Sequence, residues 1–253
     1  MPVTSPRSRH PKSFAPRNVG RESWRHRLRR PDGVVVLASG GLDSCALLAH
    51  LARAGREVFP LFVRSGLVWE RAELYWLRRY LGKLPADVAA RVRPLKVGAL
   101  PMDDLYGDHW STTGRGTPGW RAADNSVYLP GRNIVLLTKA AVYAALLGAP
   151  AVAIGPLKGN PFPDASPGFF RSLQRALSTG LDFPIKIEAP FLALDKAQII
   201  ARFRDLPLHL SFSCSKPKGR RACGVCAKCR ERVLALRLAL RAAPTAGSRR
   251  TRS

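Results

Sequence analysis

The segment between Val34 and Ser44 constrains the fold more than any other part of the chain. A short apolar run, 34–38, is followed at once by Ser-Gly-Gly-Leu-Asp-Ser, and a segment of helical character, 45–54, ends at Gly55. A short β-branched run of this kind is typical of a strand buried in a parallel sheet. Because glycines and free helix N–H groups would meet at one point, the pattern predicts an α/β protein with an anion site at this first strand–helix junction.

Strand and helix patterns alternate through the rest of the body. Further strands are expected at 57–63, 91–97, 151–155 and 185–188, and further helices at 69–81, 133–147, 169–177, 194–203 and 228–240. This alternation predicts an open, mostly parallel, Rossmann-like sheet. Residues 101–131 lack periodicity and predict a long loop of the lid type, in which His109 is a candidate base.

Positive charge is concentrated at the two ends of the chain. Lys and Arg number 42 against 17 Asp and Glu, a net charge of +25, and residues 1–31 alone hold nine basic residues and one acid. We expect basic tails at 1–31 and 243–253 that are able to touch nucleic acid non-specifically but are not required for function. The first tail lacks the apolar core of a secretory signal. The chain also contains no stretch of 18 uncharged apolar residues, so no membrane span is expected.

Four of the five cysteines lie close together, in the pattern Cys214-x8-Cys223-x2-Cys226-x2-Cys229. Four thiolates form a complete tetrahedral set for one structural zinc ion, and iron–sulfur ligation is the alternative. An odd, clustered set of cysteines does not indicate a secreted disulfide framework, so a reducing, cytoplasmic compartment is expected. Cys45 has apolar neighbours and is interpreted as a core residue. The helix 228–240 is expected to pack from the cysteine cluster onto the sheet.

The glycine loop fits neither the Walker A pattern nor the Gly-x-Gly-x-x-Gly pattern. Ser-Gly-Gly-Leu-Asp-Ser instead resembles the PP-loop of the ATP pyrophosphatases, which split ATP into AMP and pyrophosphate. This resemblance implies the adenine nucleotide alpha hydrolase type of fold and Mg²⁺ between Asp43 and the phosphates. It also implies an ATP-binding loop that consists of Ala38, Ser39, Gly40, Gly41, Leu42, Asp43 and Ser44.

The combination of this loop with the cysteine pattern resembles the 7-cyano-7-deazaguanine synthase family. Supporting matches are 129–133, 194–200 and 211–214, and the resemblance covers about residues 34–240. It implies a PP-loop ATP pyrophosphatase domain at 32–205, a zinc-binding segment at 206–242 and a homodimer. It also implies an ATP-dependent carbon–nitrogen ligase that makes a queuosine precursor. In that reaction 7-carboxy-7-deazaguanine is adenylated and converted by ammonia to an amide, and a second adenylation dehydrates the amide to the nitrile.

Four residues are candidates for catalysis or substrate binding: Asp43 in the loop, and Arg132, Lys196 and Asp164 outside it. Arg132 and Lys196 are expected to hold phosphate or carboxylate because both precede helical segments and match family positions. Lys158 and Lys186 are weaker candidates for the same role.

Two segments depart from the family pattern. Glu70 stands where the family has a histidine, and the loop 158–165 lacks the polar side chains that usually precede Pro163. Phe162 of that loop is a candidate to stack on a purine-like ring. Both departures concern recognition of the acceptor, so the sequence indicates ATP-dependent adenylation but does not identify the acceptor. The alternatives are a PP-loop enzyme that adenylates a tRNA base or another carboxylate, and a zinc-knuckle binding module whose loop is inactive.

Overall fold

The computed structural model describes residues 30–241. The basic tail 243–253 and all but the last two residues of the tail 1–31 lie outside this range. A single sheet forms the centre of the molecule, and its strands follow the order β3-β2-β1-β4-β5 with every pair parallel. The strands are β1 (Gly33–Leu37), β2 (Glu57–Arg64), β3 (Lys96–Ala99), β4 (Ala151–Ala153) and β5 (Lys186–Glu188).

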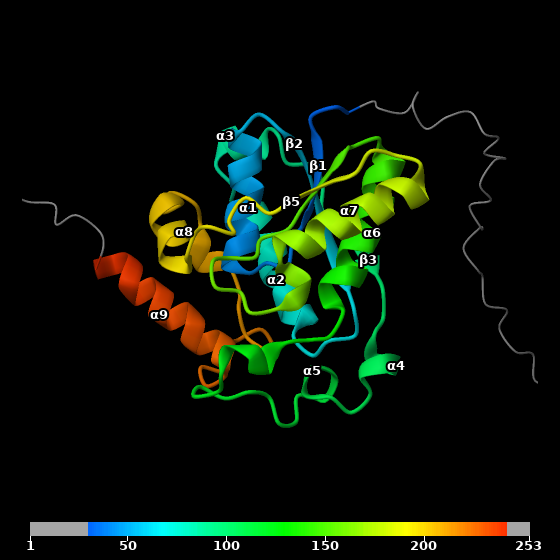
Figure 1. Cartoon of the computed structure of the whole chain (residues 1–253). Helices are drawn as coiled ribbons and strands as arrows, with labels where there is room; N and C mark the ends of the chain where they lie inside the picture. Colours follow the sequence, from blue (N-terminus) through cyan, green and yellow to red (C-terminus); the bar gives the residue numbers. More distant parts are fainter. Residues whose placement is uncertain (1–29, 242–253) are drawn as a thin grey trace, which may run out of the picture.

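Helices cover both faces of this sheet (Figure 1). The α-helices of the described residues are α1 (Leu42–Arg53), α2 (Glu70–Leu81), α3 (Ala86–Ala89), α4 (Asp103–Tyr106), α5 (Trp110–Thr113), α6 (Arg132–Leu147), α7 (Pro167–Leu181), α8 (Lys196–Arg202) and α9 (Ala227–Arg241), of which α4 and α5 lie in the 101–131 segment. Successive side chains of β1 point to opposite faces of the sheet and belong to two separate cores. Val34 and Val36 pack with α1 and α8, whereas Val35 packs with α6 and α7. The expected α/β class is confirmed.

The third strand is shorter than predicted. The sequence indicated a strand at 91–97, but the ladder with β2 begins at Lys96, and Val92 forms only an isolated bridge to Val58. Pro94 explains the difference, because a proline has no N–H to donate and interrupts a ladder at its position.

Two further expectations need correction. The long loop 101–131 contains three short helical turns, α4, α5 and the 3₁₀ turn Asp124–Val127. The helix α9 packs chiefly on α8 instead of on the sheet. Polar contacts also join α9 to the segment that precedes the cysteines, since Arg232 donates to the hydroxyl of Ser211 at 2.6 Å and to the carbonyl of Leu208 at 3.2 Å.

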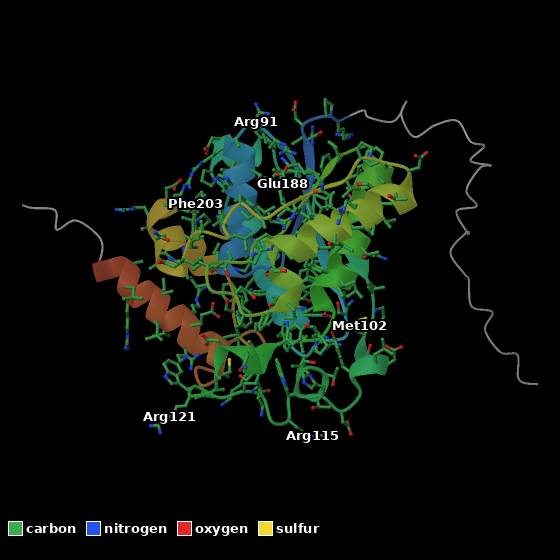
Figure 2. All side chains as sticks on the ribbon, viewed as in Figure 1. Arg91, Met102, Arg115, Arg121, Glu188 and Phe203 are labelled. Atoms are coloured by element: carbon green, nitrogen blue, oxygen red, sulfur yellow. The ribbon has the colours of Figure 1, made fainter. Side chains whose placement is uncertain are left out.

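The strand order places a binding crevice at one end of the sheet. The chain proceeds outward from β1 to β2 and β3, then returns to the other side of β1 with β4. In parallel α/β sheets, ligands bind beyond the carboxyl ends of the strands at such a reversal point. The 101–131 segment passes below this end, where Arg115 and Arg121 extend outward (Figure 2). Within 30–241, no helix is long and apolar enough to cross a membrane.

Candidate functional site

The glycine loop lies at the carboxyl end of β1 and turns directly into α1. Gly40 adopts φ +80°, and a Cβ there would lie 3.0 Å from the carbonyl oxygen of Glu73, so only glycine fits without strain. Gly41 is the N-cap of α1 and supplies no capping side chain, which leaves the first N–H groups of α1 free for a ligand. The hydroxyls of Ser39 and Ser44 lie 3.2 Å apart beside them.

A cavity of about 180 Å³ opens against this loop. Its polar wall contains four residues of the loop and the start of α1, namely Ser39, Gly41, Asp43 and Ser44. The same wall also contains Arg132 and two acids of α2, Glu70 and Glu73. Apolar side chains from the strand ends form the opposite wall: Leu37, Leu61, Phe62, Val63 and Ile154. The cavity therefore joins an anion-binding edge to an apolar slot of the kind that suits a planar ring.

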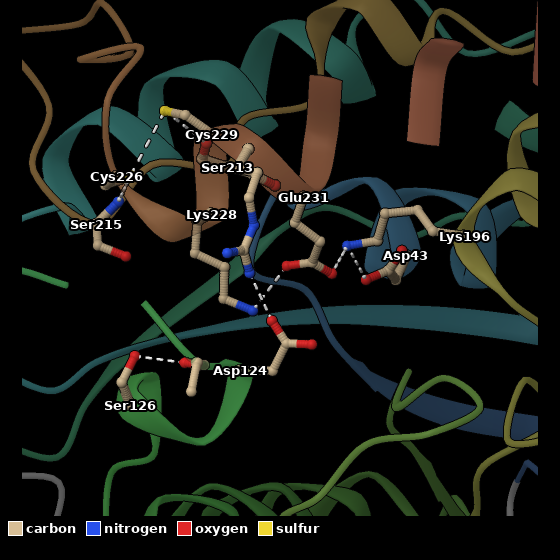
Figure 3. A network of polar contacts seen from close by, with 12 residues as sticks. Asp43, Asp124, Ser126, Lys196, Ser213, Ser215, Cys226, Lys228, Cys229 and Glu231 are labelled. Atoms are coloured by element: carbon tan, nitrogen blue, oxygen red, sulfur yellow. Dashed lines mark hydrogen bonds and ion pairs between the residues drawn. The ribbon is translucent and has the colours of Figure 1, made fainter. Parts of the chain in front are cut away.

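Asp43 belongs to a network that connects three helices (Figure 3). Its Oδ2 lies 3.3 Å from Nζ of Lys196, the first residue of α8, and its Oδ1 is buried without a hydrogen-bond partner among residues 30–241. Lys196 also pairs with Glu231 of α9, whose second oxygen accepts from Lys228 at 3.1 Å. Burial raises the pKa of Asp43, and the nearby Lys196 opposes that effect.

Arg132 is the first residue of α6 and lines both the loop cavity and a neighbouring one. Its Nε is buried and has no hydrogen-bond partner in the described part of the chain, and its guanidinium lies 6.0 Å from the centroid of the Trp69 ring. Glu73 shares the cavity wall, and burial raises its pKa to about 8, although Arg132 acts in the opposite direction. Near neutral pH the carboxyl of Glu73 is mostly protonated, so Arg132 keeps its full positive charge toward the cavity.

Asp164 lies apart from this cavity and holds the start of α6. Its carboxylate accepts from the backbone N–H of Asn133 at 3.0 Å and from the Asn133 side chain at 3.3 Å, while its backbone carbonyl accepts from that side chain at 3.0 Å. Asp164 is buried, and burial raises its pKa. Its contacts position α6, and hence Arg132, and do not face the glycine loop.

The weaker candidates fall in different places. Lys158 lines a second cavity beside Asp43, Lys228 and Glu231, whereas Lys186 lies at the opposite, amino end of β5. His109 caps α5 and its Nδ1 lies 2.9 Å from the hydroxyl of Ser111.

Two other residues occupy packed positions. The Phe162 ring packs against Tyr128, with centroids 5.1 Å apart. Cys45 is fully buried in the core, and burial raises the pKa of its thiol.

Glu70, the departure from the family pattern, organises the chain after β2. It is buried, and its carboxylate accepts from the backbone N–H of Ser65. Burial raises the pKa of Glu70, while the backbone donors of the turn and Arg132 lower it. The carboxylate thus fixes the 65–67 turn beside the cavity, a role that the sequence pattern did not reveal.

The four clustered cysteines converge on one point at the start of α9. All four Sγ atoms lie within 4.8 Å of one another, and two of the separations are 3.9 and 3.5 Å. Tetrahedral zinc with Zn–S bonds of about 2.3 Å requires sulfur separations of about 3.8 Å, so the donor set fits a metal of this size. Backbone N–H groups of Cys223 and Ser215 donate to Cys214 and Cys226 sulfurs.

Sequence reasoning missed three charged residues of the site: Glu73, Lys228 and Glu231. For Glu231 a signal existed, because it is the single acid among seven arginines in 230–253. No sequence signal indicates Glu73 or Lys228, since both occur on helices, where charged residues are usually solvated.

Fold and site together define an α/β nucleotide-binding protein whose anion loop follows the central strand. Comparison with known families then identifies the particular group. The model for "Queuosine biosynthesis protein QueC" matches residues 33–240, and the chain belongs to this family.

Curated relatives agree with this assignment. A 7-cyano-7-deazaguanine synthase of Acetivibrio thermocellus is 32% identical over 77% of this chain and 88% of its own length. The synthase of Marinobacter nauticus is 35% identical over 80% of this chain and 91% of its own. That of an Anaeromyxobacter species is 37% identical over 77% and 87%. The expected family resemblance is confirmed.

Proposed function

We propose that this protein is a 7-cyano-7-deazaguanine synthase, an ATP-dependent ligase that converts 7-carboxy-7-deazaguanine and ammonia to the nitrile. The observation that carries the proposal is the glycine loop, with its free α1 N-terminus, facing a cavity that also holds Arg132. Family membership over 33–240 supports the choice of reaction. We further propose a cytoplasmic homodimer.

ATP binds with its phosphates on the glycine loop and its adenine in the apolar slot. Ser39 and Ser44 present hydroxyls, and the α1 N–H groups face the same space, so the loop can hold the pyrophosphate that leaves. Arg132 lies across the cavity and stabilises negative charge that develops on the α-phosphate.

Asp43 holds Mg²⁺ in this proposal. A carboxylate beside a polyphosphate is unfavourable unless a cation lies between them, and the unpartnered Oδ1 of Asp43 offers an oxygen ligand. Bound Mg²⁺ would neutralise charge on the phosphates during adenylyl transfer. Lys196 keeps Asp43 oriented by pairing with its other oxygen.

The acceptor binds in the neighbouring cavity, also about 180 Å³, between the loop and the cysteine cluster. Two stacked indoles, Trp69 and Trp110, lie on its wall with centroids 5.6 Å apart and provide a flat apolar surface for a deazaguanine ring. Arg132 and Lys228 line the same cavity and offer cations to the acceptor carboxylate. Arg132 is shared by both cavities, so it can hold the two reacting groups near each other.

The cysteine cluster holds one structural zinc ion in this proposal. All four positions are thiolates and none is left for water, so the metal would stabilise the fold and take no part in the reaction. Its place at the start of α9 sets the position of Lys228 and Glu231, two and five residues after Cys226.

The test is release of AMP and pyrophosphate by the purified protein with ammonium and 7-carboxy-7-deazaguanine, together with detection of the nitrile by mass spectrometry. We expect turnover with the free base and no requirement for tRNA. Asp43→Asn should abolish AMP release while the protein keeps its zinc, and Asp104→Asn, an exposed carboxylate of α4, should behave as the wild type. Turnover that requires tRNA, or that survives Asp43→Asn, would contradict the proposal.

A further inference from the structure

A second basic surface lies on α2, outside the cavities described above. It is an open groove of about 900 Å³, here called the α2 groove. Five of its lining residues are exposed arginines that come from the end of β2, from α2 and from the cysteine segment: Arg64, Arg71, Arg78, Arg79 and Arg220. Exposed arginines occur elsewhere on the molecule, but the gathering of five around one groove requires a separate explanation.

No carboxylate of the described residues neutralises the charge of the α2 groove. Within residues 30–241, none of the five arginines has a carboxylate oxygen within 4.0 Å, whereas Arg53 lies between Asp87 and Asp205. The acid that lines the groove, Glu70, is buried with its carboxylate on the backbone of Ser65. Five like charges repel one another, so an anionic partner in the groove lowers the free energy of this surface.

The spacing of the arginines suits a chain of phosphates. Arg71 and Arg78 are seven residues apart on α2, which corresponds to about 10 Å along the helix axis. A stacked nucleic-acid strand carries one phosphate per about 3.4 Å of its axis, so this distance matches about three nucleotides. A single small anion would occupy only a fraction of the groove.

Flat side chains lie among the charges. The guanidinium of Arg220 lies 4.1 Å from the centroid of the Tyr75 ring, and that of Arg79 lies 5.7 Å from the Tyr75 and Trp76 rings. The indole N–H of Trp76 donates to the Arg220 carbonyl at 2.8 Å and holds the cysteine segment against α2. Guanidinium and aromatic planes of this kind stack on unpaired bases, which a duplex keeps hidden.

We propose that the α2 groove binds single-stranded nucleic acid, with phosphates about three nucleotides apart on Arg71 and Arg78 and a base stacked on the Arg220–Tyr75 pair. The groove is separate from the ATP and acceptor cavities, since among its lining residues only Glu70 also lines the loop cavity. This site is a binding surface beyond the proposed ligase function. It is also distinct from the basic tails, which lie outside the described residues.

The test is fluorescence anisotropy of a labelled 12-nucleotide oligouridylate with the full-length, zinc-loaded protein, titrated at several salt concentrations. The variant Arg71→Gln/Arg78→Gln removes two charges from the groove. The matched control, Arg171→Gln/Arg175→Gln, removes two exposed charges from α7. Two lost phosphate contacts should weaken binding about tenfold at 0.15 M salt and reduce the slope of log K against log salt by about 1.4.

Tyr75→Leu examines the stacking half of the proposal, because it keeps an apolar side chain and removes the ring. It should weaken binding of the oligouridylate but leave binding of inorganic polyphosphate unchanged. Circular dichroism melts check that each variant is folded. Equal binding by the wild type and the groove variant, or equal loss in the α7 control, would overturn the proposal and assign binding to the tails or to net charge. Tighter binding of an RNA duplex, or no effect of Tyr75→Leu on the oligouridylate, would overturn the single-strand assignment.

Discussion

The contact between Lys196 and Glu231 joins α8 to α9 and should make a measurable contribution to stability. Burial opposes ionisation of Glu231, but Lys228 and Lys196 outweigh it and lower its pKa from 4.5 to about 2. A net lowering of this size, with the opposing effect of burial included, corresponds to about 3.4 kcal/mol at 1.36 kcal/mol per pKa unit. Both lysines contribute to it, so only a part belongs to the Lys196–Glu231 contact. Because the Glu231 side chain is 40% exposed, screening by solvent reduces the value to about 1 kcal/mol.

A double-mutant cycle measures this value. Lys196→Met, Glu231→Gln and the double variant are unfolded in urea at pH 7 and 0.15 M salt, after zinc content is shown to be equal in all four proteins. The expected coupling is about 1 kcal/mol. A second cycle on Asp108 and Arg115, a pair in which both side chains are mostly exposed, serves as the matched control and should give a coupling near zero. A Lys196–Glu231 coupling below about 0.3 kcal/mol would refute the reasoning, since unconnected sites are additive to that level.

The pH dependence of the same contribution has a definite sign. The folded-state pKa of Glu231, about 2, lies below its ordinary value of 4.5. The stabilisation is therefore fully present above pH 4.5 and is lost as the pH falls toward 2. The difference in stability between the wild type and Glu231→Gln should shrink over this window.

Three further predictions concern the loop, the cavity and the metal. Gly40→Ala places a Cβ 3.0 Å from a backbone oxygen at φ +80°, so urea unfolding should show a loss of about 1–2 kcal/mol and calorimetry should show no ATP binding. Glu73 has a pKa of about 8, so its negative charge appears beside the phosphate site above that pH. The Kd for ATP should therefore rise between pH 7 and 9, and Glu73→Gln should remove this rise. Removal of the metal by a chelator should lower Tm by about 10 °C, as measured by circular dichroism, and an unchanged Tm would show that the cysteine cluster is not a structural metal site.

The sheet was predictable because its signals are local. The strands β1, β2 and β4 contain short apolar runs, and the glycine loop identifies the first strand–helix junction directly. The strand β5 is the charged–apolar–charged triplet Lys186–Glu188, which follows the apolar Ile185. The start of β3 was misplaced by five residues because the basic–apolar alternation of 91–97 continues through Pro94, which has no N–H for the ladder. The packing of α9 on α8 depends on contacts between residues distant in sequence, such as Lys196 with Glu231, and no local pattern contains them.

The candidate site, like the fold, was predictable where its residues are close in sequence and not where they are distant. The loop residues and the four cysteines are contiguous patterns, so sequence alone assembles each group, whereas the pairing of Asp43 with Lys196 joins residues from two distant helices. A carboxylate in a loop beyond a strand, such as Asp164, has the same sequence whether it faces a substrate or caps a helix. Here it accepts from Asn133, and its role in catalysis or substrate binding stays a prediction. The pairings of the Asp43–Lys196–Glu231 network could be found only in three dimensions, because its members come from α1, α8 and α9; of the three, Glu231 alone stood out in its local sequence. The lone acid of a basic segment is therefore the feature to examine first in such a sequence, since a carboxylate among arginines is the residue with most to gain from a specific partner.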